Sequence, residues 1–247
     1  MEENQSPQIE ENQLTSMSDL DVSSPKTILE DITGVDPKTL FPVIRLWFQN
    51  YAEVHPGFAE EFIDELKEEW YILSSKGEYH KCMFNSNTKF PLITEGWDEL
   101  KKCEGFGDNV HLDLAYYGGN LFSVVYVKHL TSCANIVPFH SRSLMPKQTF
   151  VFYVSLTGEM TKKKRLTIEN GFAQFVMEKK IQFVNCCTDD GKTYGLSVIL
   201  KGGVNLKVKL GYDWFLICEG NNFSVGDMVR FKFDTDLRCH VFKSGKC

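Results

Sequence analysis

The sequence predicts a mostly β protein made of two copies of one barrel-like domain. Residues 211–233 (GYDWFLICEGNNFSVGDMVRFKF) repeat residues 96–114 (GWDELKKCEGFGDNVHLDL) at an offset of 115. A second match, of Phe58-Ala59 with Phe172-Ala173, has an offset of 114. Hairpin corners also recur roughly every ten residues, a spacing typical of sheets of short antiparallel strands. The repeat and the spacing together predict two barrels or strongly curved sheets whose open ends are plugged by helices.

The first copy is expected to span residues 40–130. Apolar or alternating runs between turn residues predict its strands at 41–48, 70–74, 79–84, 89–94, 110–114 and 121–127. Pro56-Gly57 precedes a helix in which Phe58, Phe62 and Leu66 share one face. A second helix is expected to open at Gly96, where glycine is followed by an aromatic residue.

The second copy, expected over residues 147–247, follows the same order. Its strands are predicted at 150–156, 166–168, 181–187, 193–200, 205–210, 229–233 and 240–243. One helix follows Gly171 and another follows Gly211. In the strand 229–233, alternation places the apolar residues inward and predicts that Arg230 and Lys232 face outward as solubility residues.

Charge is segregated along the chain, although the net charge is only −6. Residues 1–39 carry −7 and are rich in Glu, Gln, Asn and Ser, which predicts a disordered acidic tail. Residues 40–130 carry −6, the linker 131–146 carries +1, and residues 147–247 carry +6. An acidic copy beside a basic copy indicates different partners for the two copies.

The motifs favour an intracellular binding protein over an enzyme. We find no signal-like segment and no run of membrane-spanning length, so the eight cysteines are expected to be reduced. The six histidines lie in separate elements without paired metal spacing, and no nucleophile elbow or phosphate-binding loop occurs; we expect no cofactor and no metal. A thiol enzyme using Cys186 or Cys218 is the catalytic alternative, but their apolar surroundings favour inert burial. A ligand-binding β-barrel is a third alternative, which would show exposed aromatic residues around a pocket.

The order of elements and three motifs of the second copy resemble the plant-specific B3 DNA-binding domain. Arg165-Leu166-Thr167-Ile168 followed by Phe172 is similar to the family's RLxIPxxF segment, although Glu169 replaces the proline. Gly211-Tyr212 is similar to its GW helix start, and residues 225–233 to its xGDxVxFxF strand. A chain with two divergent copies is most similar to the reproductive-meristem group of that family. The resemblance implies two seven-stranded open β-pseudobarrels, a fold that grips the DNA major groove with two arms.

Two basic segments of the second copy correspond to these arms, namely residues 157–165 and 201–209. Lys and Arg neutralise phosphates, Arg and Asn read base edges, and glycine allows the backbone to approach a phosphate closely. The predicted DNA-binding residues are Lys162, Lys163, Lys164, Arg165, Lys201, Gly202, Gly203, Asn205, Lys207 and Lys209. The run 162–165 also fits a nuclear-import signal or a solvated face.

These observations predict a nuclear transcription regulator whose second copy binds double-stranded DNA sequence-specifically. The corresponding arms of the first copy, 49–55 and 85–89, hold few cations. We therefore expect the first copy to serve protein contacts, self-association or support of its neighbour. The alternative is a protein-interaction scaffold in a transcriptional complex, without specific DNA binding.

Overall fold

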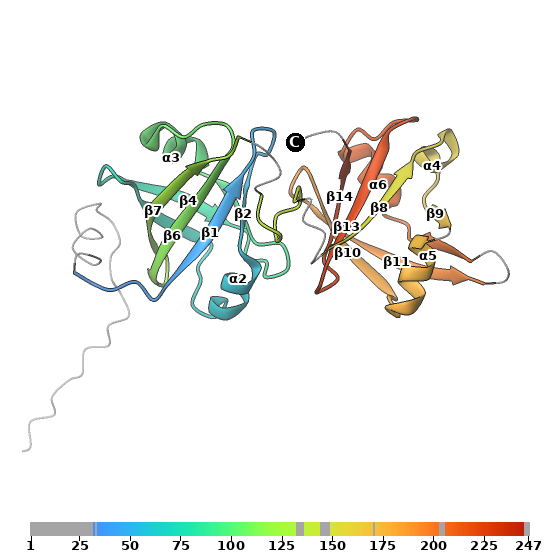
Figure 1. Cartoon of the computed structure of the whole chain (residues 1–247), viewed down its shortest axis with the longest axis horizontal. Coiled ribbons are helices and arrows are strands. Elements are labelled where there is room, and N and C mark those ends of the chain that lie inside the picture. Colours follow the sequence, from blue (N-terminus) through green and yellow to red (C-terminus); the bar gives the residue numbers. More distant parts are fainter. Residues whose placement is uncertain are drawn as a thin grey trace, which may run out of the picture.

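The chain forms two seven-stranded sheets with short helices, which confirms the predicted fold class (Figure 1). The computed structural model describes residue 32 and residues 34–131, 136–143, 149–169, 171–202 and 206–244. Most of the predicted acidic tail lies outside the described residues. Among the described residues, no helix combines the length and the apolar character needed to cross a membrane.

The first unit is a closed barrel with the strand order β1-β2-β5-β4-β3-β7-β6. Its elements are β1 (Thr39–Arg45), β2 (Ala52–Val54), α2 (Pro56–Phe62), β3 (Glu69–Leu73), β4 (Tyr79–Phe84), β5 (Leu92–Glu95), α3 (Trp97–Glu104), β6 (Val110–Gly118) and β7 (Leu121–His129). Its strand pairs are antiparallel except for β3 with β7. Trp70 stacks between Phe84 and Phe122, with ring centroids 4.6 and 4.2 Å apart, so aromatic rings fill the barrel.

The second unit repeats this connectivity in the order β8-β13-β14-β10-β11-β12-β9. Its elements are β8 (Thr149–Ser155), α4 (Gly158–Lys162), β9 (Leu166–Glu169), α5 (Gly171–Glu178), β10 (Phe183–Thr188), β11 (Thr193–Lys201), β12 (Lys207–Leu210), α6 (Trp214–Gly220), β13 (Met228–Asp234) and β14 (Cys239–Lys243). The two units differ at one seam. In the first unit β1 pairs with β2 through Val43–Val54 and Ile44–Glu53, whereas β8 and β9 are the two edges of an open sheet.

The repeated glycine is required because the chain passes very close to a strand before the helix. Gly96 has φ +80°, and a Cβ atom there would lie 1.9 Å from the carbonyl oxygen of Lys81. At Gly211 a Cβ atom would lie 2.3 Å from Oγ of Ser197. No larger side chain fits either position without moving the backbone or the neighbouring strand.

The aromatic residue of the repeat behaves differently in the two units. Trp97 begins α3 and is buried against Phe106, with ring centroids 6.0 Å apart. In the second unit α6 begins at Trp214, which is fully buried and lies 6.3 Å from Phe223. Tyr212, which matches Trp97 in sequence, is 61% exposed. Trp214 is therefore the spatial counterpart of Trp97.

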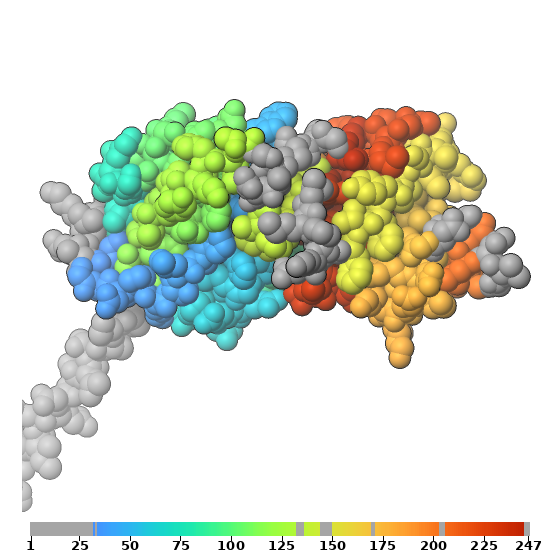
Figure 2. Space-filling view, viewed as in Figure 1, coloured from blue at the N-terminus to red at the C-terminus, as the bar shows by residue number. Residues whose placement is uncertain are grey.

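The two units are adjoining lobes, and residues 136–143 lie between them (Figure 2). Arg230 and Lys232 are only 5% and 1% exposed, so the prediction that they face solvent is wrong. Nη2 of Arg230 donates to the Ser141 carbonyl at 3.0 Å, and Nζ of Lys232 donates to the Pro138 carbonyl at 3.1 Å. Burial lowers the pKa of Lys232 to about 8. Alternation identified the outer face of β13 correctly, but that face is covered by the linker.

Candidate nucleic-acid interface

The open seam of the second unit forms a groove of about 680 Å³. Strand β8 lines one side, β9 and β12 line the other, and α4 closes one end. The lining side chains are Tyr153, Val154, Ser155, Thr157, Glu159, Met160, Lys163, Arg165, Thr167, Ile168, Lys201, Lys207 and Lys209. Five of these thirteen are lysine or arginine and one is a carboxylate, so the groove is strongly basic.

Helix α4 is held at the groove by local bonds on both sides. Oγ1 of Thr157 caps the helix by accepting from the backbone N–H of Met160 at 3.3 Å. The indole Nε1 of Trp214 donates to the carbonyl of Met160 at 2.9 Å, which fixes α4 to the buried start of α6. The first predicted arm is thus partly helical and anchored to the core of its own unit.

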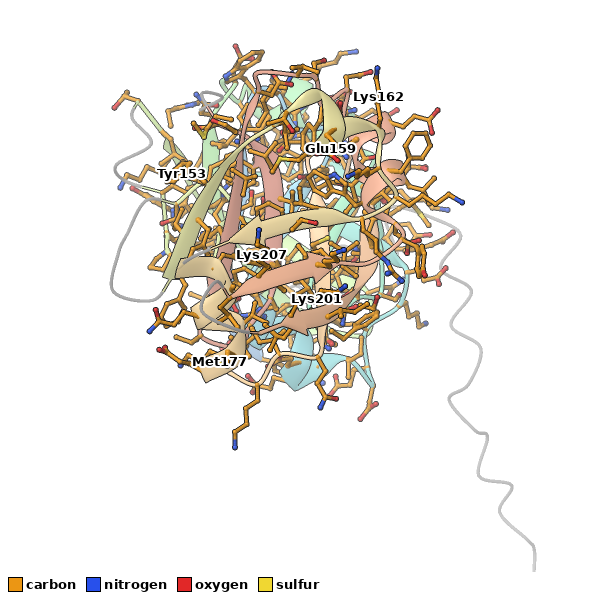
Figure 3. The ribbon with its side chains drawn as sticks, turned by 90° about the vertical axis from the view of Figure 1, so that its right-hand side faces the viewer. Tyr153, Glu159, Lys162, Met177, Lys201 and Lys207 are labelled. Carbon is orange, nitrogen blue, oxygen red and sulfur yellow. The ribbon has the colours of Figure 1, made fainter. Side chains whose placement is uncertain are left out.

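The basic side chains approach the groove from both predicted arms. In β12, Val208 and Leu210 are buried, and the alternating Lys207 and Lys209 line the groove. Lys201, at the end of β11, pairs in register with Lys207. Figure 3 shows Lys201 and Lys207 on the sheet and Lys162 with Glu159 near α4, all on one end of the molecule.

Arg165 is the most constrained cation of the groove. Its guanidinium lies 3.9 Å from the centre of the exposed Tyr212 ring, a cation–π geometry. Its Nε atom is buried and has no hydrogen-bond partner among the described residues. Lys163 forms an ion pair with Glu159 on the preceding turn. That pair is largely exposed, so a phosphate can displace the carboxylate at little cost.

The structure therefore brings together Lys163, Arg165, Lys201, Lys207 and Lys209 of the predicted residues. Lys162 and Lys164 are exposed beside the groove but do not line it. Gly202 is exposed with open space around it. Gly203 and Asn205 lie outside the described residues. The sequence reasoning did not single out Tyr153, a 54% exposed groove residue that the outward phase of β8 could have indicated.

Most of the equivalent surface of the first unit is covered by the linker and the second unit. By the repeat offsets, Gln49, Tyr51, Leu92 and Thr94 occupy the places of Lys163, Arg165, Lys207 and Lys209. The hydroxyl of Tyr51 donates to the Thr188 carbonyl at 3.4 Å. Tyr51 and Leu92 also form an apolar cluster with Phe90 and Cys187. The seam that is an open basic groove in the second unit is closed and largely covered in the first, where Thr94 is the one exposed residue of these four.

The cysteines named for a thiol enzyme are poor nucleophiles. Cys186 and Cys218 are buried, and burial raises the pKa of each thiol to about 12. A thiol with such a pKa is protonated at neutral pH, whereas catalysis needs the thiolate. The structure thus favours the inert role expected for both residues.

The chain is similar to the solved structure of a hypothetical Arabidopsis thaliana protein, At1g16640.1. The two share 22% sequence identity, and the match covers 39% of this chain and 91% of that chain with a TM-score of 0.32. No protein-family model and no curated protein matches the chain.

Proposed function

We propose that the second unit binds double-stranded DNA through the groove between β8 and β9, and that the chain is a nuclear transcription regulator of the B3 type. The supporting observation is the convergence of both basic arms on one open seam. Phosphate neutralisation supplies most of the affinity of such proteins for DNA. Lys201, Lys207 and Lys209 on one wall and Lys163 at the end closed by α4 provide that charge.

Arg165 is the residue we assign to base recognition. A guanidinium that is held in place reads the O6 and N7 atoms of guanine through two hydrogen bonds. The Tyr212 ring fixes the plane of the Arg165 guanidinium, and the side chain lines the open groove. Asn205, which follows on the second arm, remains our candidate for adenine contact.

The first unit is proposed as a supporting and interaction module. Its counterpart of the groove is covered, and residues 40–130 carry a charge of −6, which repels a phosphate backbone. Its function is then to hold the second unit, and its remaining outer surface is free for protein partners or self-association.

A salt titration of the full-length chain tests the proposal, with a probe obtained by selection from random oligonucleotides. Three groove lysines are changed together to alanine, at positions 163, 201 and 209. Each lost phosphate contact lowers the slope of log affinity against log salt by about 0.9, so the triple variant should lose about 2.7.

The control removes the same number of positive charges from the first unit. It carries Lys67→Ala, Lys102→Ala and Lys128→Ala, all at exposed positions. It should keep the wild-type slope and sequence preference. An equal loss of salt slope in both triple variants would refute the groove assignment and favour the scaffold alternative. Selection that enriches no sequence would do the same.

A further inference from the structure

Three potential metal ligands meet at one end of the first unit, far from the groove in the second. A carboxylate oxygen of Glu78, a ring nitrogen of His80 and Sγ of Cys103 all lie within 4.8 Å of one another. The distance from Sγ of Cys103 to Oε2 of Glu78 is 3.4 Å. Zinc bonds of about 2.3 Å to sulfur and 2.0 Å to oxygen span a tetrahedral edge of about 3.5 Å. Two ligand atoms therefore already stand at zinc-site spacing.

One ring nitrogen of His80 is buried and unpartnered in the part of the chain that the structure describes. His80 lies on β4, its side chain is 9% exposed, and this nitrogen is Nε2. A buried imidazole without a hydrogen bond destabilises the folded chain, and ligation of a metal by the ring compensates for this.

The two segments that carry the ligands are already joined. Oγ of Ser75, in the turn between β3 and β4, donates to Oε2 of Glu104 at 2.7 Å. Lys76 in the same turn donates to the carbonyl of Cys103. These bonds hold the turn that carries Glu78 against the C-terminal end of α3. The negative end of the helix dipole also lies there and favours a bound cation.

The second unit shows what the same place looks like without the ligands. Cys218 corresponds to Cys103 in the repeat. The pairing of His80 with Ile72 in the first unit and of Tyr194 with Cys186 in the second places Tyr194 at the position of His80. Lys192, two residues before Tyr194, stands where Glu78 does. In space, however, the register that places Trp214 at the position of Trp97 puts Gly220 where Cys103 stands, and a Cβ atom on Gly220 would lie 3.1 Å from the hydroxyl of Tyr194. The second unit therefore lacks all three ligands at this place.

We propose that Glu78, His80 and Cys103 bind Zn²⁺ with a fourth position open to water. A thiolate and an imidazole select zinc over magnesium or calcium, which prefer oxygen ligands alone. The sequence predicted no metal because these residues do not form a linear motif; strand β4 and helix α3 bring them together in space. The bound ion clamps the β3–β4 turn to α3 and stabilises the first unit.

The full-length chain, with Cys133→Ser and Cys247→Ser to remove thiols outside the described residues, is titrated with Co²⁺ as a spectroscopic probe. The parent should bind one equivalent with thiolate-to-cobalt charge-transfer absorption, and Zn²⁺ should displace the cobalt. Cys103→Ser should abolish the absorption, and His80→Gln should weaken Zn²⁺ binding about tenfold or more. Cys218→Ser is the matched control and should bind as the parent does.

Urea unfolding provides a second readout, because a ligand that binds only the folded state raises its stability. Zn²⁺ should raise the unfolding midpoint of the parent and of Cys218→Ser, but not of Cys103→Ser. If Cys103→Ser fails to fold, Glu78→Gln at the exposed turn replaces it and should also weaken binding. Cobalt absorption that survives loss of Cys103, or a parent without such absorption, would overturn the proposal.

Discussion

Arg142, in the linker, is predicted to contribute more than any other side chain to the stability of the contact between the two units. Its side chain is 1% exposed, and its Nη2 atom donates to both carboxylate oxygens of Asp189. Nη1 donates to the carbonyl of Lys243 at 3.1 Å. The guanidinium also lies 3.6 Å from the centre of the Phe242 ring and 4.7 Å from that of Phe48. One side chain of the linker thus contacts a ring of each unit and an acid of the second.

Replacing Arg142 with alanine should lower the free energy of unfolding by about 3 kcal/mol. Loss of one partner of a buried ion pair costs about 3–5 kcal/mol. We take the lower end because the Asp189 side chain is 20% exposed and keeps some hydration after its partner is gone. Urea unfolding measures the loss. The single transition should also become two, because the variant uncouples the units.

A double-mutant cycle separates the ion pair from the packing. Arg142→Met keeps much of the apolar stem between the rings, and Asp189→Asn removes the partner charge. The two changes should be non-additive by about 1–3 kcal/mol if the pair contributes as the geometry indicates. Exposed Lys128→Ala is the control and should change stability by less than about 0.5 kcal/mol. A loss below about 1 kcal/mol in Arg142→Ala, with one transition retained, would refute the reasoning.

Three further predictions concern the groove, the interface and the repeat. Glu159→Gln removes the carboxylate that lines the groove, so DNA binding at low salt should tighten about threefold in a fluorescence titration; unchanged affinity would contradict this. Burial and nearby cations depress the pKa of His140 well below its usual value. Below pH 6.5 this residue therefore contributes a loss of stability of about 1.4 kcal/mol per pH unit, beside the loss from His240, whose pKa burial lowers to about 3. A His140→Gln variant should lose this contribution to the slope. If stability falls with pH in parallel in the variant and the parent, the assignment to His140 is wrong. Gly96→Ala should lower the stability measured by thermal unfolding by about 3 kcal/mol or more, because its Cβ atom meets the Lys81 carbonyl. Gly105→Ala, where the space is open, should lower it by only about 1–2 kcal/mol. Equal losses of stability in the two variants would show that the contact with Lys81 is unimportant.

The geometry around His140 explains the direction of its pKa shift. Its Nδ1 atom accepts from the backbone N–H of Arg142 at 3.0 Å, so the single ring proton lies on Nε2. Nε2 is 3.2 Å from Oε1 of Gln49 and 3.3 Å from Oε1 of Glu53. Protonating Nδ1 would set two N–H groups against each other beside the charges of Lys232 and Arg142. The folded state therefore binds this proton less well than the unfolded state, and acid destabilises the interface.

The fold was predictable because local signals and the repeat agree. The hairpin corner Asp189-Asp190-Gly191 joins β10 to β11, and Gly191 has the positive φ that such a corner needs. Turn residues at regular spacing mark most strand ends, and a repeated order fixes two units of the same topology. The closure of the first seam was not predictable, because only two residue pairs join β1 to β2. Strand β2 has only three residues, which is too short for an alternation of apolar and polar residues to be recognised in the sequence.

The site was predictable only in part, since alternation tells which face a residue lies on and not what covers that face. Lys207, Lys209, Arg230 and Lys232 all alternate with buried apolar residues. The first two line an open groove, and the last two are buried against the linker. The difference arises from contacts with a segment about 90 residues away in the chain. No local pattern records such a contact.

The packing of the two units accounts for the different surroundings of their two seams. Each unit has a front, which is the seam, and a back formed by its parallel strand pair and the strand beside it. The front of the first unit, at Tyr51, contacts the back of the second, at Thr188. This head-to-tail arrangement covers most of the front of the first unit and leaves the front of the second unit open. A cation at the place of Tyr51 would be buried at the interface, whereas Arg165 at the equivalent place lines an open groove. The apolar and polar seam of the first unit and the basic seam of the second then correspond to the two sides of one asymmetric contact.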